Sequence, residues 1–244
     1  MELTGKIALV VGGGGGMGLA IGKALSLEGC KVALSDCDEQ AVRKAAEAAS
    51  PSAPLPWRVC DITDREQVAR LFQWVGKELG AVEILINCAG INIPNRMLAT
   101  VDPAEFDRVM AVNFTGAFNV IFAALPGMRE GRSGLIVNIV SVAGKRVLPI
   151  SGLPYTASKF AMSALGTFVN LEECEKNGIR VTNIYPGEAN TPMVDRRPTP
   201  PPPERRAKML QPEDIADCVL LVAKLPPRAV VQELVITPTH MLID

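Results

Sequence analysis

Three residues near the middle of the sequence have the types and the spacing of a proton-transfer site. Ser141 ends the apolar run IVNIVS, and Tyr155 and Lys159 follow in PYTASKF at positions i and i+4. On a helix this spacing puts the phenol and the ammonium group on one face, a turn apart. A tyrosine becomes a base at neutral pH only if its pKa falls by roughly 3, or about 4 kcal/mol. A cation about 4 Å away supplies about that much at an effective dielectric constant near 20.

An isolated pair of this kind also fits a packed tyrosine beside a surface lysine, so a second motif is needed. Six of the seven residues from Gly12 to Gly18 are glycine, between the apolar run KIALVV and the helix-like segment LAIGKALSLEG. A strand, a glycine turn and a helix N-terminus form an anion site. In the spacing Gly12, Gly16, Gly18 the first glycine supports the turn, the second admits a pyrophosphate and the third allows close helix packing. The alternative, a flexible linker, does not fit the continuous hydrophobic pattern around it.

Polar or small residues follow three further apolar runs, where the strands of such a fold end. Asp36 ends KVALSD, and its carboxylate can accept both hydroxyls of an adenosine ribose; the alternative is a helix N-cap. Asp61 and Ile62 follow WRVC and could flank an adenine. The stretch 87–90, NCAG, is small enough for a cofactor to pass close to the backbone, although it could also be a simple turn.

Short apolar runs alternate with helical segments, which predicts an α/β fold. We expect one domain over residues 1–244, a doubly wound, seven-stranded parallel sheet of the Rossmann type with helices on both faces. The expected strands are 6–12, 31–36, 56–60, 82–87, 134–140, 179–185 and 231–237, and the expected helices are 16–29, 38–50, 64–80, 103–129, 154–177 and 212–224. The segment RRPTPPPPERR, residues 196–206, contains five prolines and predicts an extended loop over the site, within a substrate loop at about 190–210.

Composition excludes several other classes of function. The 244 residues are 48% hydrophobic and 21% charged, with a formal net charge of -1, which gives no electrostatic case for nucleic acid or an anionic membrane. Six cysteines occur without a CxxC pair or metal-ligand spacing, which predicts reduced thiols, no metal site and a cytoplasmic protein. We expect no segment long and apolar enough to cross a membrane. The single histidine, His240, is expected at the surface or an interface.

These motifs together resemble the short-chain dehydrogenase/reductase family, in its single-domain branch, over essentially the whole chain. The matching residues, in family order, are Gly12, Gly16, Gly18, Asp61, Asn87-Cys88-Ala89-Gly90, Asn113, Ser141, Tyr155, Lys159, Pro186-Gly187 and Thr191. The resemblance implies that Tyr155 is the acid/base, that Lys159 lowers its pKa and holds the nicotinamide ribose, and that Ser141 orients the substrate oxygen. It also implies a water-linked proton path at Asn113 and a contact from Thr191 to the carboxamide.

The implied binding residues form two sets. The cofactor set is Gly12, Gly15, Gly16, Met17, Gly18, Asp36, Cys37, Asp61, Ile62, Asn87, Ala89, Gly90, Tyr155, Lys159, Pro186, Gly187, Ala189 and Thr191. The substrate set is Ile93, Val142, Leu153, Glu188 and Met193, with Arg96, Glu188 and Arg196 as polar selectors. The interval from Ser141 to Tyr155 is one residue longer than the family pattern, so we expect a bulge at 150–154.

The expected activity is NAD-dependent interconversion of a secondary alcohol and a ketone. NAD is favoured because Asp36 would repel the 2′-phosphate of NADP, and because Gly15 and Cys37 stand where the family often has a basic residue. The alternatives are a reductase of 3-oxo acids and a catalytically idle dinucleotide-binding scaffold or sensor. An ATPase is disfavoured because no GK[ST] follows the glycines. The family resemblance also implies a homotetramer that pairs through the helices at 103–129 and 154–177 and through the final strand.

Overall fold

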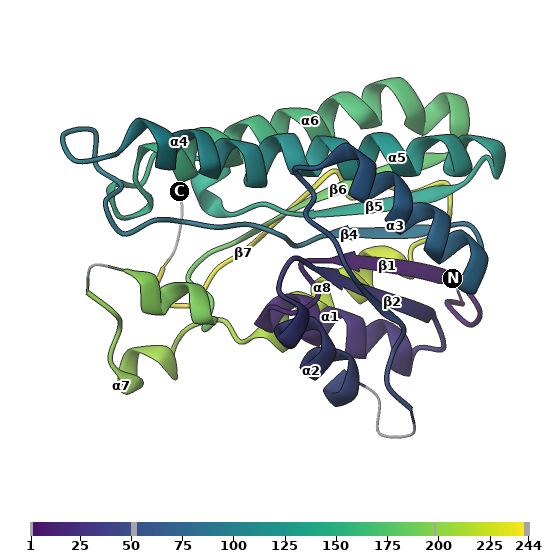
Figure 1. Ribbon diagram of the computed structural model, residues 1–244, viewed down its shortest axis with the longest axis horizontal. Helices are drawn as coiled ribbons and strands as arrows, with labels where there is room; N and C mark the ends of the chain where they lie inside the picture. Colours follow the sequence, from purple (N-terminus) through teal and green to yellow (C-terminus); the bar gives the residue numbers. More distant parts are fainter. Residues whose placement is uncertain (1, 50–52, 198, 242–244) are drawn as a thin grey trace.

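The structure, a computed structural model, describes residues 2–49, 53–197 and 199–241, and a seven-stranded parallel sheet runs through its centre (Figure 1). The strand order is β3-β2-β1-β4-β5-β6-β7. The strands are β1 (Ile7–Val11), β2 (Lys31–Asp36), β3 (Trp57–Val59), β4 (Ile84–Asn87), β5 (Gly134–Ile139), β6 (Ile179–Pro186) and β7 (Glu233–Ile236). The order reverses direction between β1 and β4, and a ligand of such a sheet binds at that point, beyond the carboxyl ends of the strands.

Helices cover both faces of the sheet. They are α1 (Gly16–Leu27), α2 (Glu39–Ala49), α3 (Arg65–Glu78), α4 (Pro103–Met110), α5 (Ala117–Glu130), α6 (Leu153–Asn177), α7 (Pro203–Arg206) and α8 (Pro212–Ala223). A π-helical turn, Ala111–Gly116, joins α4 to α5. In Figure 1 α5 and α6 run together along one face, whereas α1, α2 and α8 lie on the other. The predicted doubly wound fold is confirmed.

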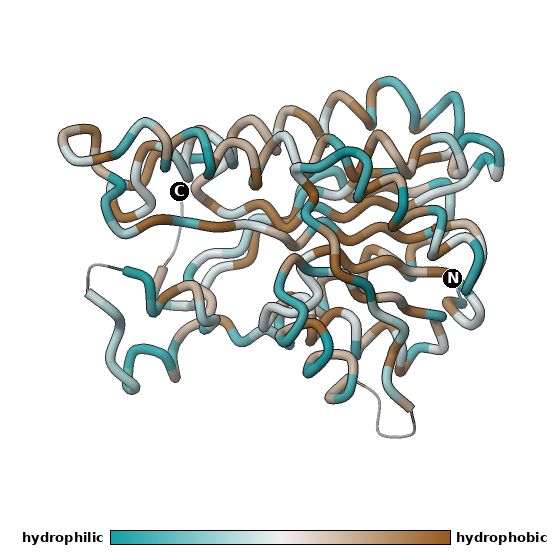
Figure 2. Tube along the Cα trace, viewed as in Figure 1, coloured by the Kyte–Doolittle hydropathy of each residue, from teal (hydrophilic) through white to brown (hydrophobic). Residues whose placement is uncertain are grey.

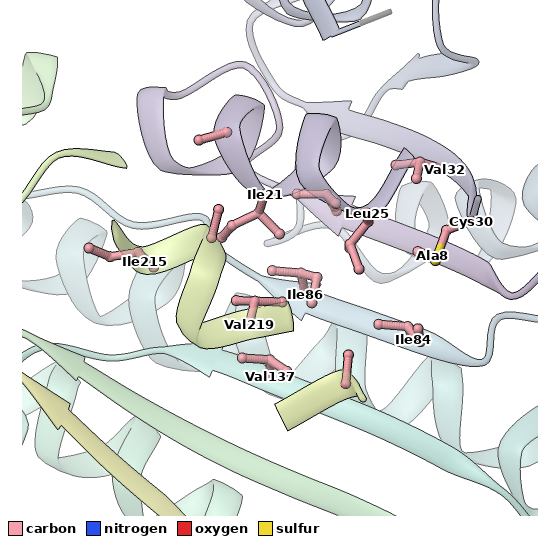
Figure 3. Packing of buried hydrophobic residues seen from close by; sticks show 14 of the residues in the cluster. Ala8, Ile21, Leu25, Cys30, Val32, Ile84, Ile86, Val137, Ile215 and Val219 are labelled. Carbon is pink, nitrogen blue, oxygen red and sulfur yellow. The ribbon is translucent and has the colours of Figure 1, made fainter. Parts of the chain in front are cut away.

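The two faces are built by alternation along the strands. Ala8 and Val10 of β1 pack into the cluster that contains α1, α2 and α8, whereas Leu9 and Val11 pack into the cluster that contains α3, α5 and α6. Figure 3 shows Ile21 and Leu25 of α1 meeting Val219 of α8 over Ile86 of β4. Because both faces are covered, the central strands are apolar nearly throughout, as the brown sheet in Figure 2 shows.

The structure adds detail to two of the expected segments. The helix expected at 103–129 is continuous from Pro103 to Glu130, and its residues Ala111–Gly116 form a π turn, a feature that often marks a functional site. The proline-rich segment is not extended throughout, because α7 (Pro203–Arg206) forms a single turn with Pro203 at its first position. Proline fits there because the first helical N–H has no partner within the helix.

The expectation of no membrane-length apolar segment is also wrong. The continuous helical run Pro103–Glu130 has 28 residues and a mean hydropathy of 1.6 in its most apolar window, which meets the length and composition of a membrane span. Half of that window is buried inside the protein. Its apolar residues, such as Val120, Ile121 and Ala124, pack against the sheet with α3, which is typical of a core helix.

Candidate active site

Tyr155 and Ser141 reach one pocket from two different elements. Tyr155 lies in the first turn of α6, which starts after Gly152 with Pro154 near its N-terminus. Ser141 follows β5, and its hydroxyl accepts a hydrogen bond from the Ala143 N–H at 3.1 Å. Both residues line the pocket together with Lys159. The residues Pro149–Ser151 form a 3₁₀ turn and Gly152 has φ +76°. This turn overlaps the bulge expected at 150–154 and accommodates the additional residue between Ser141 and Tyr155.

The electrostatics of Tyr155 differ from the sequence expectation. The Lys159 Nζ lies 5.6 Å from the centroid of the Tyr155 ring and donates a hydrogen bond to the Ile139 carbonyl at 3.0 Å. Burial raises the pKa of Tyr155 above its ordinary value, although Ser141, Arg197 and Arg96 act in the opposite direction. Burial also lowers the pKa of Lys159 to about 8. Burial therefore acts against the lowering of the Tyr155 pKa that is expected from Lys159, and that lowering stays a prediction.

Asn113 lies in the π turn and holds the backbone beside the pocket. Its Oδ1 accepts from the Ile91 N–H at 2.8 Å, and its Nδ2 donates to the Ile91 carbonyl and to the Ser158 hydroxyl at 3.0 Å each. A Cβ added at Gly90 would lie 3.4 Å from the Lys159 Nζ and 3.5 Å from the Asn113 Oδ1. Asn113 therefore fixes the segment after β4 close to Lys159, while its expected part in a proton path stays a prediction.

The glycine loop has the shape of a cradle for a diphosphate. Gly12 has φ +80° and a Cβ there would overlap the Ala89 backbone, and a Cβ at Gly18 would overlap the Gly12 carbonyl oxygen. Gly15 and Gly16 are different, because a Cβ at either would lie 3.5 Å or more from any other residue. Gly12 and Gly18 thus allow close packing of the backbone, whereas Gly15 and Gly16 leave open space at the start of α1. These residues fit a dinucleotide, whose diphosphate the start of α1 would hold.

Asp36 lies at the end of β2 beside this cradle. Its carboxylate accepts from the Gly14 N–H at 3.0 Å and from the Asp38 N–H at 3.2 Å. The cap of the following helix is instead Asp38, which accepts from the Ala41 N–H at 3.0 Å. Within the described ranges no lysine or arginine pairs with Asp36, and its neighbour Cys37 is exposed. The carboxylate therefore braces the glycine loop and has no cationic partner among these residues.

The remaining cofactor residues lie along the same edge. Ile62 is buried under Gly116, whereas the Asp61 carboxylate is exposed and accepts from Thr63. Met17, Gly90, Pro186, Gly187, Ala189 and Thr191 line the pocket. Cys88 also lines it, and burial raises its pKa to about 12, so it stays a neutral thiol.

An asparagine ladder behind this edge was not anticipated. Asn87, Asn138 and Asn183 stand in register on β4, β5 and β6, and Asn138 donates to Asn183 at 2.9 Å while Asn87 donates to Asn138 at 3.3 Å. All three are buried. The signal in the sequence was an asparagine in each of three largely apolar runs, because a buried asparagine needs hydrogen-bond partners.

The substrate end agrees in part with the expected residues. Val142, Glu188 and Met193 line the pocket, whereas Ile93 is buried in the interior and Leu153 is exposed, and neither lines it. Arg96 lines the pocket as expected. The second arginine in the lining is Arg197 and not Arg196, whose carbonyl oxygen accepts from Arg96. The sequence offered two adjacent arginines, and only the fold decides which one faces inward.

Glu188 is the centre of a charged cluster beside the pocket. Its Oε1 pairs with Arg197 Nη1 at 2.6 Å and its Oε2 pairs with Arg205 Nη2 at 3.0 Å, and the His240 Nε2 lies 3.6 Å away. The Glu188 side chain is only 9% exposed. Burial opposes its ionisation, but the two arginines outweigh burial and lower the pKa of Glu188 below its ordinary value. His240 therefore belongs to this cluster, near the loop that covers the site.

Comparison with known proteins agrees with the motifs. The family model described as short chain dehydrogenase matches residues 6–201. An uncharacterized oxidoreductase of Staphylococcus saprophyticus is 31% identical over 240 residues, which cover 98% of this chain and 99% of that protein. The chain therefore belongs to the short-chain dehydrogenase family of oxidoreductases, as its motifs predict.

Other relatives differ in length or in bound cofactor. Glycine betaine reductase ATRR of Emericella nidulans is 34% identical over 243 residues, which cover 97% of this chain but only 19% of that protein. A metagenomic short-chain oxidoreductase solved in complex with NADP has a TM-score of 0.82, 29% identity and coverage of 98% of this chain and 99% of that one. Solved structures with the same fold include complexes with NADP and with NADH.

Proposed function

We propose that this protein interconverts a secondary alcohol and a ketone with a nicotinamide dinucleotide. The observation that carries the proposal is that Ser141, Tyr155 and Lys159 line the same pocket as Met17, at the start of the helix after the glycine loop. When bound, the dinucleotide supplies the carbon that accepts or donates a hydride. The chain's own part is to orient the substrate oxygen with Ser141 and to exchange the proton of that oxygen with the Tyr155 phenol.

The charges around Tyr155 support this role. With a pKa of about 8, Lys159 is mostly protonated at neutral pH, so its ammonium group favours a nearby phenolate. Arg96 and Arg197 also lower the pKa of the Tyr155 phenol. Two cations outside the family motif, Arg96 and Arg197, thus favour the Tyr155 phenolate.

For the cofactor we propose NAD, and the support is Asp36. Its carboxylate has no cationic partner in the part of the chain that the structure describes, and the 2′-phosphate of NADP adds roughly two negative charges at that end of the ligand. Since solved relatives include NADP complexes, this choice depends on the residues of this chain and not on the family.

The test is a turnover assay on a panel of secondary alcohols and ketones, with NAD and NADP in parallel and absorbance of the reduced nicotinamide as the signal. We expect turnover with NAD and at least one pair of substrates. Dinucleotide binding without turnover of any substrate would favour the idle scaffold. Turnover restricted to 3-oxo acids would narrow the alcohol–ketone activity to that of a 3-oxo acid reductase.

We further propose that the protein is a cytoplasmic homotetramer. All six cysteines carry free thiols, which fits a reducing compartment. Large apolar side chains are exposed on α5 and α6, and Phe122, Phe168 and Leu171 are each more than 60% exposed. An apolar face of this kind suits a contact with a second copy. Sedimentation at micromolar concentration checks the assembly, and a purely monomeric species would reject it.

A further inference from the structure

Arg96 is a buried cation that faces the substrate end of the pocket. The residue is 6% exposed and lines the pocket beside Ile150, Arg197 and Tyr155. Burial and the nearby Arg197 lower its pKa from the ordinary value, while Tyr155 acts in the opposite direction. The charge is therefore held against a desolvation cost, at a position within electrostatic reach of the acid/base tyrosine.

The stem of Arg96 is fixed by the turn that precedes α6. A Cβ at Gly152 would overlap the Arg96 side chain, and the Arg96 carbonyl oxygen accepts from the Leu153 N–H at 3.1 Å. The guanidinium donates to the Ile150 carbonyl and to the Arg196 carbonyl, at 3.2 Å each. Arg96 thereby joins both loops that flank the pocket, and its side chain has little freedom to swing away.

The guanidinium keeps donors that have no partner in the protein. It has five N–H donors, and the structure gives two hydrogen bonds to it, both to neutral carbonyl groups. Its Nε is buried without a partner. No carboxylate among residues 2–49, 53–197 and 199–241 pairs with it. A buried arginine without a counter-ion is costly, and a ligand anion would remove that cost.

Glu188, a carboxylate in the pocket lining, is already paired. Glu188 uses one oxygen for Arg197 and the other for Arg205. Glu188 thus pairs with Arg197 and Arg205, whereas neither Arg96 nor the Lys159 ammonium in the same lining has an acidic partner among the described residues. A cationic substrate would meet this excess of positive charge, and neither oxygen of Glu188 is free of an arginine. The balance favours an anionic substrate.

We propose that Arg96 binds the carboxylate of the substrate, so that the alcohol and ketone pair are a hydroxy acid and the corresponding oxo acid. The inference rests on the proposed alcohol–ketone activity and narrows its substrate class. The carboxylate is unchanged in the reaction and serves to orient the hydroxyl carbon towards Ser141 and Tyr155. An arginine suits this task because its planar fork matches a carboxylate with two parallel hydrogen bonds.

The first test uses the wild-type protein with matched pairs of 2-, 3- and 4-oxo acids and their methyl esters, which differ in charge at one end. We expect kcat/KM to be at least about 10-fold higher for the acid in at least one pair, mainly through KM. Equal or higher values for every ester would overturn the role of Arg96. Dinucleotide turnover with simple neutral ketones but no acid would also overturn it, while leaving the proposed function intact. Turnover of none of the acids, esters and ketones would mean that the proposed function itself has failed.

The second test compares Arg96→Met and Arg96→Lys with Arg70→Met, which removes an exposed arginine on α3. For the preferred acid we expect Arg96→Met to lower kcat/KM about 100-fold, Arg96→Lys to recover part of the loss, and Arg70→Met to have no effect. For the matching ester we expect a change below about 3-fold in all three variants. An equal loss on the acid and the ester would mean that Arg96 only supports the loops, and would reject the proposal. If Arg96→Met does not fold, the Arg96→Lys variant and the wild-type acid and ester ratio still decide.

Discussion

The two ends of the pocket are built in different ways. The dinucleotide end consists of backbone: Gly12 and Gly18 are packed too closely to accept a Cβ, and Asp36 accepts its hydrogen bond from the Gly14 N–H. The substrate end consists of charged side chains from separate segments, with Arg96 after β4, Glu188 after β6 and their partners on the loop that follows. The hydrogen bond from Gly14 to Asp36 joins residues 22 apart in the chain, whereas that from Arg96 to the Arg196 carbonyl joins residues 100 apart.

The largest expected effect lies where the two ends meet, at Tyr155. Tyr155→Phe keeps the ring but removes the proton donor, so we expect kcat to fall by about 10² to 10⁴. Dinucleotide affinity should stay within a few-fold of wild type, because the binding loop of the dinucleotide end does not contain this residue. Steady-state kinetics and fluorescence titration with NADH measure the two quantities. If the variant keeps more than a tenth of the wild-type kcat, the acid/base lies elsewhere.

What could be predicted from sequence follows the same division. The strands, the glycine loop and the triad of Ser141, Tyr155 and Lys159 were predicted because each depends on residues close in the chain and on a fixed backbone geometry. The sequence analysis named Arg196, but the pocket lining contains Arg197 instead, because a short 3₁₀ turn, Pro192–Arg196, has too few residues for a periodicity that orients its side chains. It also did not predict that Lys159 would point at the Ile139 carbonyl, since spacing on a helix gives the face but not the rotamer.

Cofactor choice tests the dinucleotide end. We expect kcat/KM with NAD to exceed that with NADP by at least about 100-fold, which needs about 2.7 kcal/mol of discrimination. The reason is the carboxylate of Asp36, which forms no ion pair with a lysine or arginine among the described residues.

The matching variant is Asp36→Ala, in which the ratio should shrink because NAD binds more weakly and the repulsion of NADP is relieved. The measurement is kcat/KM for one alcohol with each cofactor, in wild type and variant. Equal kcat/KM values for the two cofactors in the wild-type protein would show that Asp36 only braces the glycine loop and does not select the cofactor.

A pair of alanine substitutions separates packing from ligand space within the same loop. In Gly18→Ala the new methyl overlaps the Gly12 carbonyl oxygen, so we expect a loss of about 1–3 kcal/mol in the free energy of unfolding. In Gly16→Ala the nearest atoms lie 3.7 Å away, so stability should be unchanged or slightly higher while dinucleotide affinity falls. Urea denaturation and NADH titration on both variants check this, and equal stability of the two would contradict the packing argument.

The smallest expected effect lies at the substrate end, in Glu188→Gln. This change weakens two ion pairs, one of them to the half-exposed Arg205, so we expect a loss of about 1 kcal/mol. For a chain of this length that corresponds to about 2–4 °C in Tm. Glu47→Gln, which changes an exposed glutamate on α2, is the matched control and should leave Tm unchanged.

The pH dependence of this difference tests its electrostatic origin. The arginines hold the pKa of Glu188 below its ordinary value of 4.5 in the folded protein, so the unfolded chain binds the proton more tightly. The stabilisation is therefore fully present above pH 4.5 and is lost as the pH falls through the lower pKa of the folded state. Thermal unfolding of wild type and Glu188→Gln, followed from neutral pH into the acid range, should give two Tm values that converge. A Tm difference that persists unchanged in acid would mean that Glu188 stabilises the loop by packing and not by its charge. The substrate end would then resemble the dinucleotide end, where close packing at Gly12 and Gly18 determines the structure.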